Sequence, residues 1–88
     1  MNKFEIELLK RAFQNYENTG NPEAIYQTRN GDDWLYNSEA LRSLVDDGYV
    51  TTDGSFDPDE TNLGVIMQPI HYSITQKGID YIKEHPNL

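Results

Sequence analysis

Oxygen-bearing side chains alternate along one stretch of this sequence, in the pattern that calcium-binding loops use. The alternating residues are Asp53, Ser55, Asp57 and Asp59. A calcium loop also needs a glycine at its sharp turn and a bidentate glutamate at its end, whereas Pro58 and Gly64 stand at these places. We therefore expect an acidic, solvated loop here and no metal site.

The histidines and the missing cysteines limit the other chemistry that the chain can carry. The chain has two histidines, His71 and His85, and no cysteine, and the histidines do not have the spacing of a zinc-binding pair. The sequence contains neither a glycine-rich phosphate loop nor a nucleophile elbow. We therefore expect no enzymatic activity and no cofactor.

The net charge is concentrated in residues 32–60. The chain has 15 acidic and 7 basic residues and a formal net charge of −8. Residues 32–60 hold nine of the acidic residues and a single basic one, Arg42, so they carry the whole net charge. The nine acidic residues are Asp32, Asp33, Glu39, Asp46, Asp47, Asp53, Asp57, Asp59 and Glu60. Such a segment repels polyanions and attracts basic surfaces.

Length and composition predict one small folded domain, residues 1–88. The chain has 88 residues, and its six Tyr, three Phe and one Trp can bury large areas in a core. No apolar run approaches the length of a membrane span, and Glu5 comes too early for a signal peptide. Because the absence of cysteine favours a reducing compartment, we expect a cytoplasmic protein.

The first third of the chain predicts a long helix followed by an ambiguous short element. Apolar spacing predicts a helix over residues 2–17. Asn21 and Pro22 then form a helix-start signature, yet residues 24–29 also suit a short strand. We favour a short helix over residues 22–29 and keep the strand as the alternative.

The next helix is predicted to follow a turn at residues 30–33. Asn37 or Ser38 is expected to cap it, and it should run through Asp47 with Gly48 as its left-handed end. Residues 34–36, which include the single tryptophan, are expected to form a short turn under the core. The exposed side of the helix should hold Glu39, Arg42, Ser43, Asp46 and Asp47.

Two strands and a last helix are predicted in the remainder. The strands cover residues 49–52 and 64–74, and the second should present Ile66, Ile70, Tyr72 and Ile74 on one side. Pro69 cannot donate a ladder hydrogen bond, so we expect an edge strand or a bend there. Thr75 should cap the last helix, which His85 and Pro86 should end.

Two stretches resemble winged-helix proteins. Residues 41–50 (LRSLVDDGYV) look like the end of a recognition helix that enters the first wing strand. Residues 72–82 (YSITQKGIDYI) resemble the Leu-Thr-x-Lys-Gly junction of MarR-like and PadR-like regulators, which joins the second wing strand to the following helix. The layout also resembles small phage- and prophage-associated proteins of the YjcQ type, over residues 37–84.

This resemblance implies an α+β winged helix-turn-helix domain, with an antiparallel sheet of two or three strands and a long wing loop. It also implies DNA binding, but a DNA-reading helix normally carries Arg or Lys, and this one is acidic. The leading hypothesis is therefore a regulatory or accessory protein whose nine acidic residues bind a basic protein surface. The alternative is a DNA-binding homodimer of the transcriptional-regulator type, with contacts from Arg29, Arg42 and Lys77. Against both stands the commonest role of a charged face, which is simply to be solvated.

Overall fold

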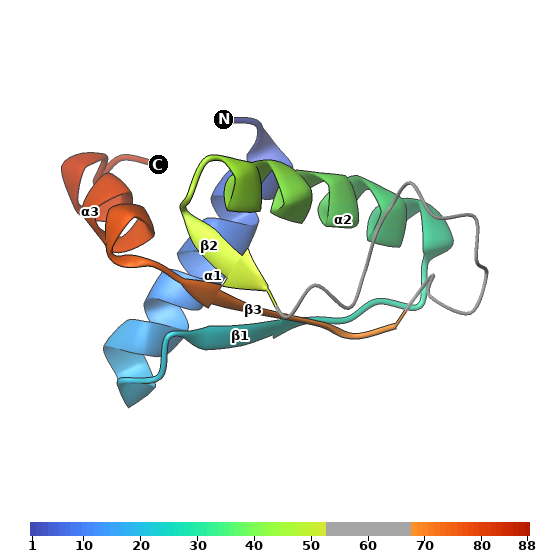
Figure 1. The fold of residues 1–88 in the computed structure, drawn as a ribbon, viewed down its shortest axis with the longest axis horizontal. Coiled ribbons are helices and arrows are strands. Elements are labelled where there is room, and N and C mark those ends of the chain that lie inside the picture. The colour runs from blue at the N-terminus through green and yellow to red at the C-terminus, as the bar shows by residue number, and fades with distance from the viewer. Residues whose placement is uncertain (53–67) are drawn as a thin grey trace.

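The computed structural model describes residues 1–52 and 68–88. In chain order the elements are α1 (Lys3–Thr19), β1 (Glu23–Tyr26), α2 (Gly31–Asp46), β2 (Val50–Thr52), β3 (Ile70–Ile74) and α3 (Gln76–Glu84). The strands form one antiparallel sheet in the order β1-β3-β2 (Figure 1). The chain is thus a small α+β domain, as the sequence predicted. No helix in the described part is long and apolar enough to cross a membrane.

Helix α1 begins with a capping box and ends at a glycine. The Asn2 side chain accepts a hydrogen bond from the Glu5 N–H (2.9 Å), and the Glu5 carboxylate accepts one from the Asn2 N–H (3.3 Å). Gly20 closes the helix at φ 76°, in the left-handed region that glycine adopts without strain. The buried side of α1 holds Leu8, Leu9 and Ala12, along with Glu5.

Strand β1 replaces the short helix that we favoured for residues 22–29, so that prediction is wrong and the alternative strand is correct. Asn21 does accept the Glu23 N–H (3.0 Å), as a helix cap would. However, burial then alternates, with Tyr26 8% exposed and Ile25 48% exposed. All four residues pair with β3, and this long-range pairing outweighs the local helix signal.

Strand β3 is the centre of the sheet, so the edge strand, one of the two alternatives that Pro69 suggested, is wrong. It pairs with β1 on one side and with β2 on the other. Pro69 lies just before the strand, so its missing N–H removes no ladder hydrogen bond. Ile70, Tyr72 and Ile74 are buried on one side, as predicted. Ile66, predicted on the same side, falls in the stretch 53–67, outside the described residues.

The two faces of the sheet differ in character. One packs against α1 and α2 and forms the hydrophobic core with them. The other face is largely exposed and carries Glu23, Ile25, Thr51 and His71. Nδ1 of His71 lies 3.1 Å from Oε1 of Glu23. His71 is therefore a surface residue of β3.

The junction between β3 and α3 fastens the last helix to the end of α2. Thr75 caps α3 by accepting the Gly78 N–H (3.2 Å), and its hydroxyl lies 2.6 Å from the Gly48 carbonyl oxygen. The Thr75 N–H donates to the Tyr49 carbonyl oxygen (3.0 Å). Gly78 packs so tightly that an added Cβ would lie 2.4 Å from the same Tyr49 oxygen. The residues of the predicted Thr-x-Lys-Gly junction thus hold α3 against the chain that links α2 to β2.

Candidate functional site

Helix α2 begins at Gly31, well before the cap that we predicted at residues 37–38. The Asn30 side chain accepts hydrogen bonds from the N–H groups of Asp32 (2.9 Å) and Asp33 (3.1 Å). An asparagine cap followed by two carboxylates in the first turn suits the positive end of the helix dipole. The predicted turn is therefore wrong, because these residues start the helix.

The earlier start also corrects the turn that we predicted for residues 34–36. Trp34 faces the core and is 1% exposed, and its Nε1 donates to the Gln68 carbonyl oxygen (2.9 Å). Leu35 (36% exposed) and Tyr36 (55% exposed) lie on the outside of the helix instead. The Tyr36 ring stacks on Phe4 of α1 with the ring centres 5.6 Å apart. Of the three residues, only the tryptophan belongs to the core.

Acidic side chains follow the exposed side of α2 from one end to the other. Asp32, Glu39 and Asp46 recur at seven-residue intervals, which places them along one side of the helix. Asp33 and Asp47 are exposed near the two ends. We call these five residues the acidic face. The helix has 16 residues, so the acidic face is about 24 Å long.

Two apolar side chains interrupt the acidic face. Leu35 and Tyr36 lie one turn from both Asp32 and Glu39, at spacings of three and four residues. Exposed apolar area therefore lies directly beside charged groups on this side of α2. Sequence reasoning missed Leu35 and Tyr36 because it placed the helix start too late. The sequence signal that marks the true helix start is Asn30 followed by two acidic residues.

The remaining acidic residues that the sequence proposed for partner binding are not among the described residues. Asp53, Asp57, Asp59 and Glu60, together with the calcium-like pattern, lie outside the described residues. Within the described part, therefore, the predicted partner-binding residues are the four on α2 and Asp47 at its C-cap.

A lysine from α3 complements the end of α2 where the dipole is negative. Lys77 Nζ donates to the main-chain oxygen of Asp47 and lies 4.6 Å from the centre of the Tyr49 ring. A cation at this position offsets part of the repulsion between the dipole and the two carboxylates of the last turn. Lys77, proposed from sequence as a phosphate contact, therefore has a structural role in joining α3 to α2.

Asp46 and Asp32 should affect stability in opposite directions, although both are exposed acids on one helix. We expect Asp46→Asn to raise the free energy of unfolding by about 0.3–1 kcal/mol and Asp32→Asn to lower it by a similar amount. Each variant loses one negative charge, so both reduce the repulsion within this acidic chain to the same extent, and the helix dipole accounts for the difference between them. Urea unfolding at low and high salt measures both, and two shifts of the same sign would contradict the dipole argument.

The three predicted DNA contacts are spread along α2 and do not converge. Arg29 precedes the Asn30 cap, Arg42 projects from the acidic face, and Lys77 lies beyond the other end of the helix. Arg29 and Arg42 are both exposed. These cations are therefore interspersed with five carboxylates and form no continuous basic surface.

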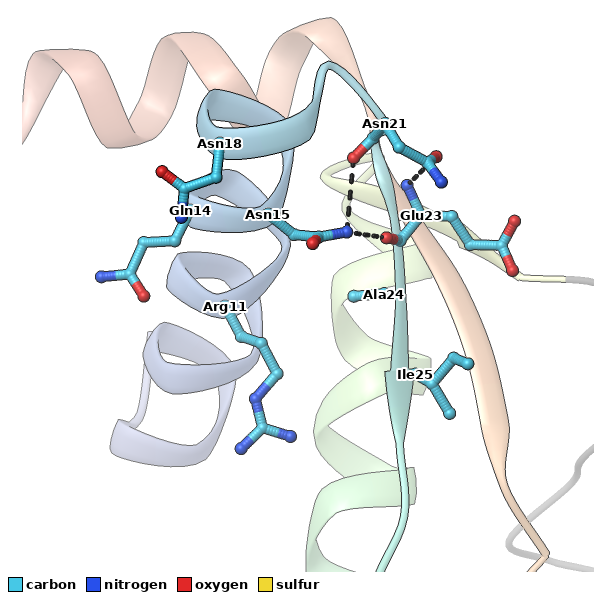
Figure 2. A pocket seen from close by; sticks show the side chains of 8 residues that line it. All are labelled: Arg11, Gln14, Asn15, Asn18, Asn21, Glu23, Ala24 and Ile25. Carbon is cyan, nitrogen blue, oxygen red and sulfur yellow. Dashed lines mark hydrogen bonds between the residues drawn. The ribbon is translucent and has the colours of Figure 1, made fainter.

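A groove of about 580 Å³ runs between α1 and β1 (Figure 2). Half of its lining residues are amides, namely Gln14, Asn15, Asn18 and Asn21, and Arg11 and Glu23 are the charged members. In Figure 2, Asn15 reaches from α1 to the main-chain oxygen of Glu23. The groove follows the outer edge of the sheet.

The buried polar groups of the core are explained by structural hydrogen bonds. The Tyr72 hydroxyl donates to the Leu8 carbonyl oxygen (2.8 Å), and burial raises its pKa. Burial likewise raises the pKa of Tyr26, whose hydroxyl accepts from Asn37 (2.9 Å). Glu5 accepts from the Ser43 hydroxyl (3.4 Å) as well as closing its capping box.

No group of three or more acidic or histidine side chains in the described ranges is placed to hold a metal ion. Comparison with known proteins adds no assignment: no protein-family model matches the chain, and no curated protein or solved structure matches it either.

Proposed function

We propose that this chain is a winged-helix-like, non-enzymatic domain that binds a basic protein surface through the acidic face of α2. The observation that carries the proposal is the exposed row of Asp32, Glu39 and Asp46 with Tyr36 in its midst. A cationic partner would gain attraction along the helix, and the exposed ring would supply apolar contact.

The winged-helix part of the proposal is supported by where the two resembling stretches fall. Residues 41–50 run from α2 into β2, and residues 72–82 run from β3 into α3. In the winged-helix proteins that they resemble, the corresponding stretches stand at the same helix-to-strand and strand-to-helix junctions. The domain departs from the family in one respect, because a helix-turn-helix has two helices and residues 31–46 form one continuous helix.

The charge on α2 favours a protein partner over DNA. A helix that enters a DNA groove lies between phosphates, and five carboxylates there would be repelled. Arg42 is the single basic residue on this helix. Exposed Leu35 and Tyr36 suit a protein surface, which offers apolar contact next to its charges.

Binding to a synthetic amphipathic peptide rich in Arg and Leu tests the proposal. We expect the peptide to bind at low ionic strength, with an affinity that falls as salt is added. Neutralising the row in the triple variant Asp32→Asn, Glu39→Gln and Asp46→Asn should weaken binding by about tenfold, which corresponds to about 1.4 kcal/mol. Fluorescence anisotropy of the labelled peptide measures the affinity.

A matched control separates the acidic face from overall charge. The variant Glu17→Gln, Asp80→Asn and Glu84→Gln removes three other exposed acids, none of them on α2, and has the same net charge. It should bind the peptide nearly as well as the original chain. Equal weakening in both triple variants, or binding of a labelled DNA duplex in preference to the peptide, would overturn the proposal.

A further inference from the structure

Strand β1 has an outer edge on which, within residues 1–52 and 68–88, one strand residue keeps its main-chain groups unpaired. The Ile74 N–H donates to the Pro22 oxygen (3.0 Å), and hydrogen-bonded positions alternate along an antiparallel pair. The main-chain groups of Glu23 and Ile25 therefore point away from β3. Glu23 is already satisfied, because Asn21 accepts its N–H (3.0 Å) and Asn15 donates to its oxygen. Among the described residues, nothing accepts a hydrogen bond from the Ile25 N–H or donates one to its carbonyl oxygen at this edge.

The Ile25 side chain is also unusually exposed for a strand residue. It is 48% exposed on the outer face of the sheet, although β-branched residues stabilise strands mainly by packing against neighbours. Native proteins usually cover or charge a sheet edge to prevent it from pairing with another strand. Here Asn15 and Asn21 cover the edge at Glu23, as Figure 2 shows, and among the described residues no side chain is hydrogen-bonded to the main chain of Ile25.

The surface around this edge is one that a second copy of the chain could approach. The chain carries a net charge of −8, so two copies repel each other wherever their acidic faces would meet. The groove beside β1 has one basic and one acidic residue, Arg11 and Glu23, and is otherwise lined by amides and apolar atoms. Amides both donate and accept hydrogen bonds. The amides of one copy can therefore pair with the same amides of a second copy related by two-fold symmetry.

We propose that two copies of this chain associate by antiparallel pairing of their β1 edges, centred on Ile25. The N–H of each Ile25 donates to the carbonyl oxygen of the other, which joins the two sheets into one of six strands. The two Ile25 side chains then lie side by side on the outer face. The α1 helices meet through the amides of Gln14 and Asn18, and both acidic faces remain free. This association is independent of the partner proposed for α2.

Light scattering as a function of protein concentration tests the association. The expected mass rises from 10.2 kDa toward twice that value. Ile25→Lys would bring two like charges together at the two-fold axis and should weaken association at least tenfold. Thr51→Lys is the matched control, since it puts the same charge on the same exposed face but on β2, and it should associate like the original chain.

Single cysteines check the register. The chain has no cysteine, so Ile25→Cys can form a disulfide only between two molecules. The Cα atoms of a hydrogen-bonded antiparallel pair lie about 5.5 Å apart, within the range that a disulfide spans. We expect Ile25→Cys to cross-link rapidly and Thr51→Cys slowly. A monomeric mass at every concentration, or equal cross-linking of both variants, would overturn the proposal.

Discussion

Replacing Trp34 with alanine should cost about 3–5 kcal/mol of the free energy of unfolding, the loss typical of a large buried aromatic side chain. Trp34 is 1% exposed and belongs to the core shared by α1, α2 and the sheet. A domain of this size has a total stability of about 4–13 kcal/mol, so the variant should be largely destabilised and could unfold. Urea unfolding followed by far-UV circular dichroism measures the loss.

Two further variants keep the tryptophan prediction interpretable. Trp34→Phe retains an aromatic ring but loses the hydrogen bond to Gln68, so it should lose clearly less stability than Trp34→Ala. Leu35→Ala changes the neighbouring residue on the exposed side of the same helix and should cost less than about 1 kcal/mol. If Trp34→Ala were no worse than Leu35→Ala, the placement of Trp34 in the core and of Leu35 on the exposed side of α2 would be wrong.

Replacing Gly78 with alanine should cost about 3 kcal/mol, at the upper end of the usual penalty for overpacking. The new Cβ would lie 2.4 Å from the Tyr49 oxygen and 2.7 Å from Cγ1 of Ile74. The oxygen cannot easily move away, because it accepts the Thr75 N–H that closes the junction (3.0 Å). We therefore expect α3 to shift or detach, and urea unfolding to show a lower midpoint.

Gly31 supplies the control for Gly78. An added Cβ at Gly31, in the first turn of α2, meets no atom within 4 Å, and Gly31→Ala should leave stability unchanged or raise it slightly. Both variants add one methyl group to a helix, so the difference between them isolates the close contact. Equal stabilities would show that the β3–α3 junction is looser than described.

The sequence predicted the elements that depend on local signals. The α1 helix, the left-handed Gly48 (φ 82°) and the Thr75 cap are all set by residues within a turn of one another, and the structure confirms them. The features that depend on long-range contacts were harder to predict. Strand β1 contradicts its own helix-start residues because pairing with β3 and burial of Tyr26 are available only in the folded chain.

The candidate site was predictable in charge but not in composition. Glu39, Asp46 and Asp47 were assigned to the exposed side of a helix from their spacing, whereas Asp32 and Asp33 were wrongly placed in a turn before it. Leu35 and Tyr36 could not be added to them, because we took the cap from residues 37–38 instead of from Asn30. The compensation of Asp47 by Lys77 also depends on how α3 packs against α2, which no local pattern specifies.

Mapping the peptide contact on the chain residue by residue tests the central claim most directly. An isotope-labelled sample titrated with the Arg- and Leu-rich peptide should show amide shift changes concentrated in α2, between Asp32 and Asp46, and around the Tyr36 ring. The amides of β1 should move little. Changes confined to the groove beside Arg11, or changes around Arg29 and Lys77 that only a DNA duplex produces, would contradict a protein-binding role for the acidic face.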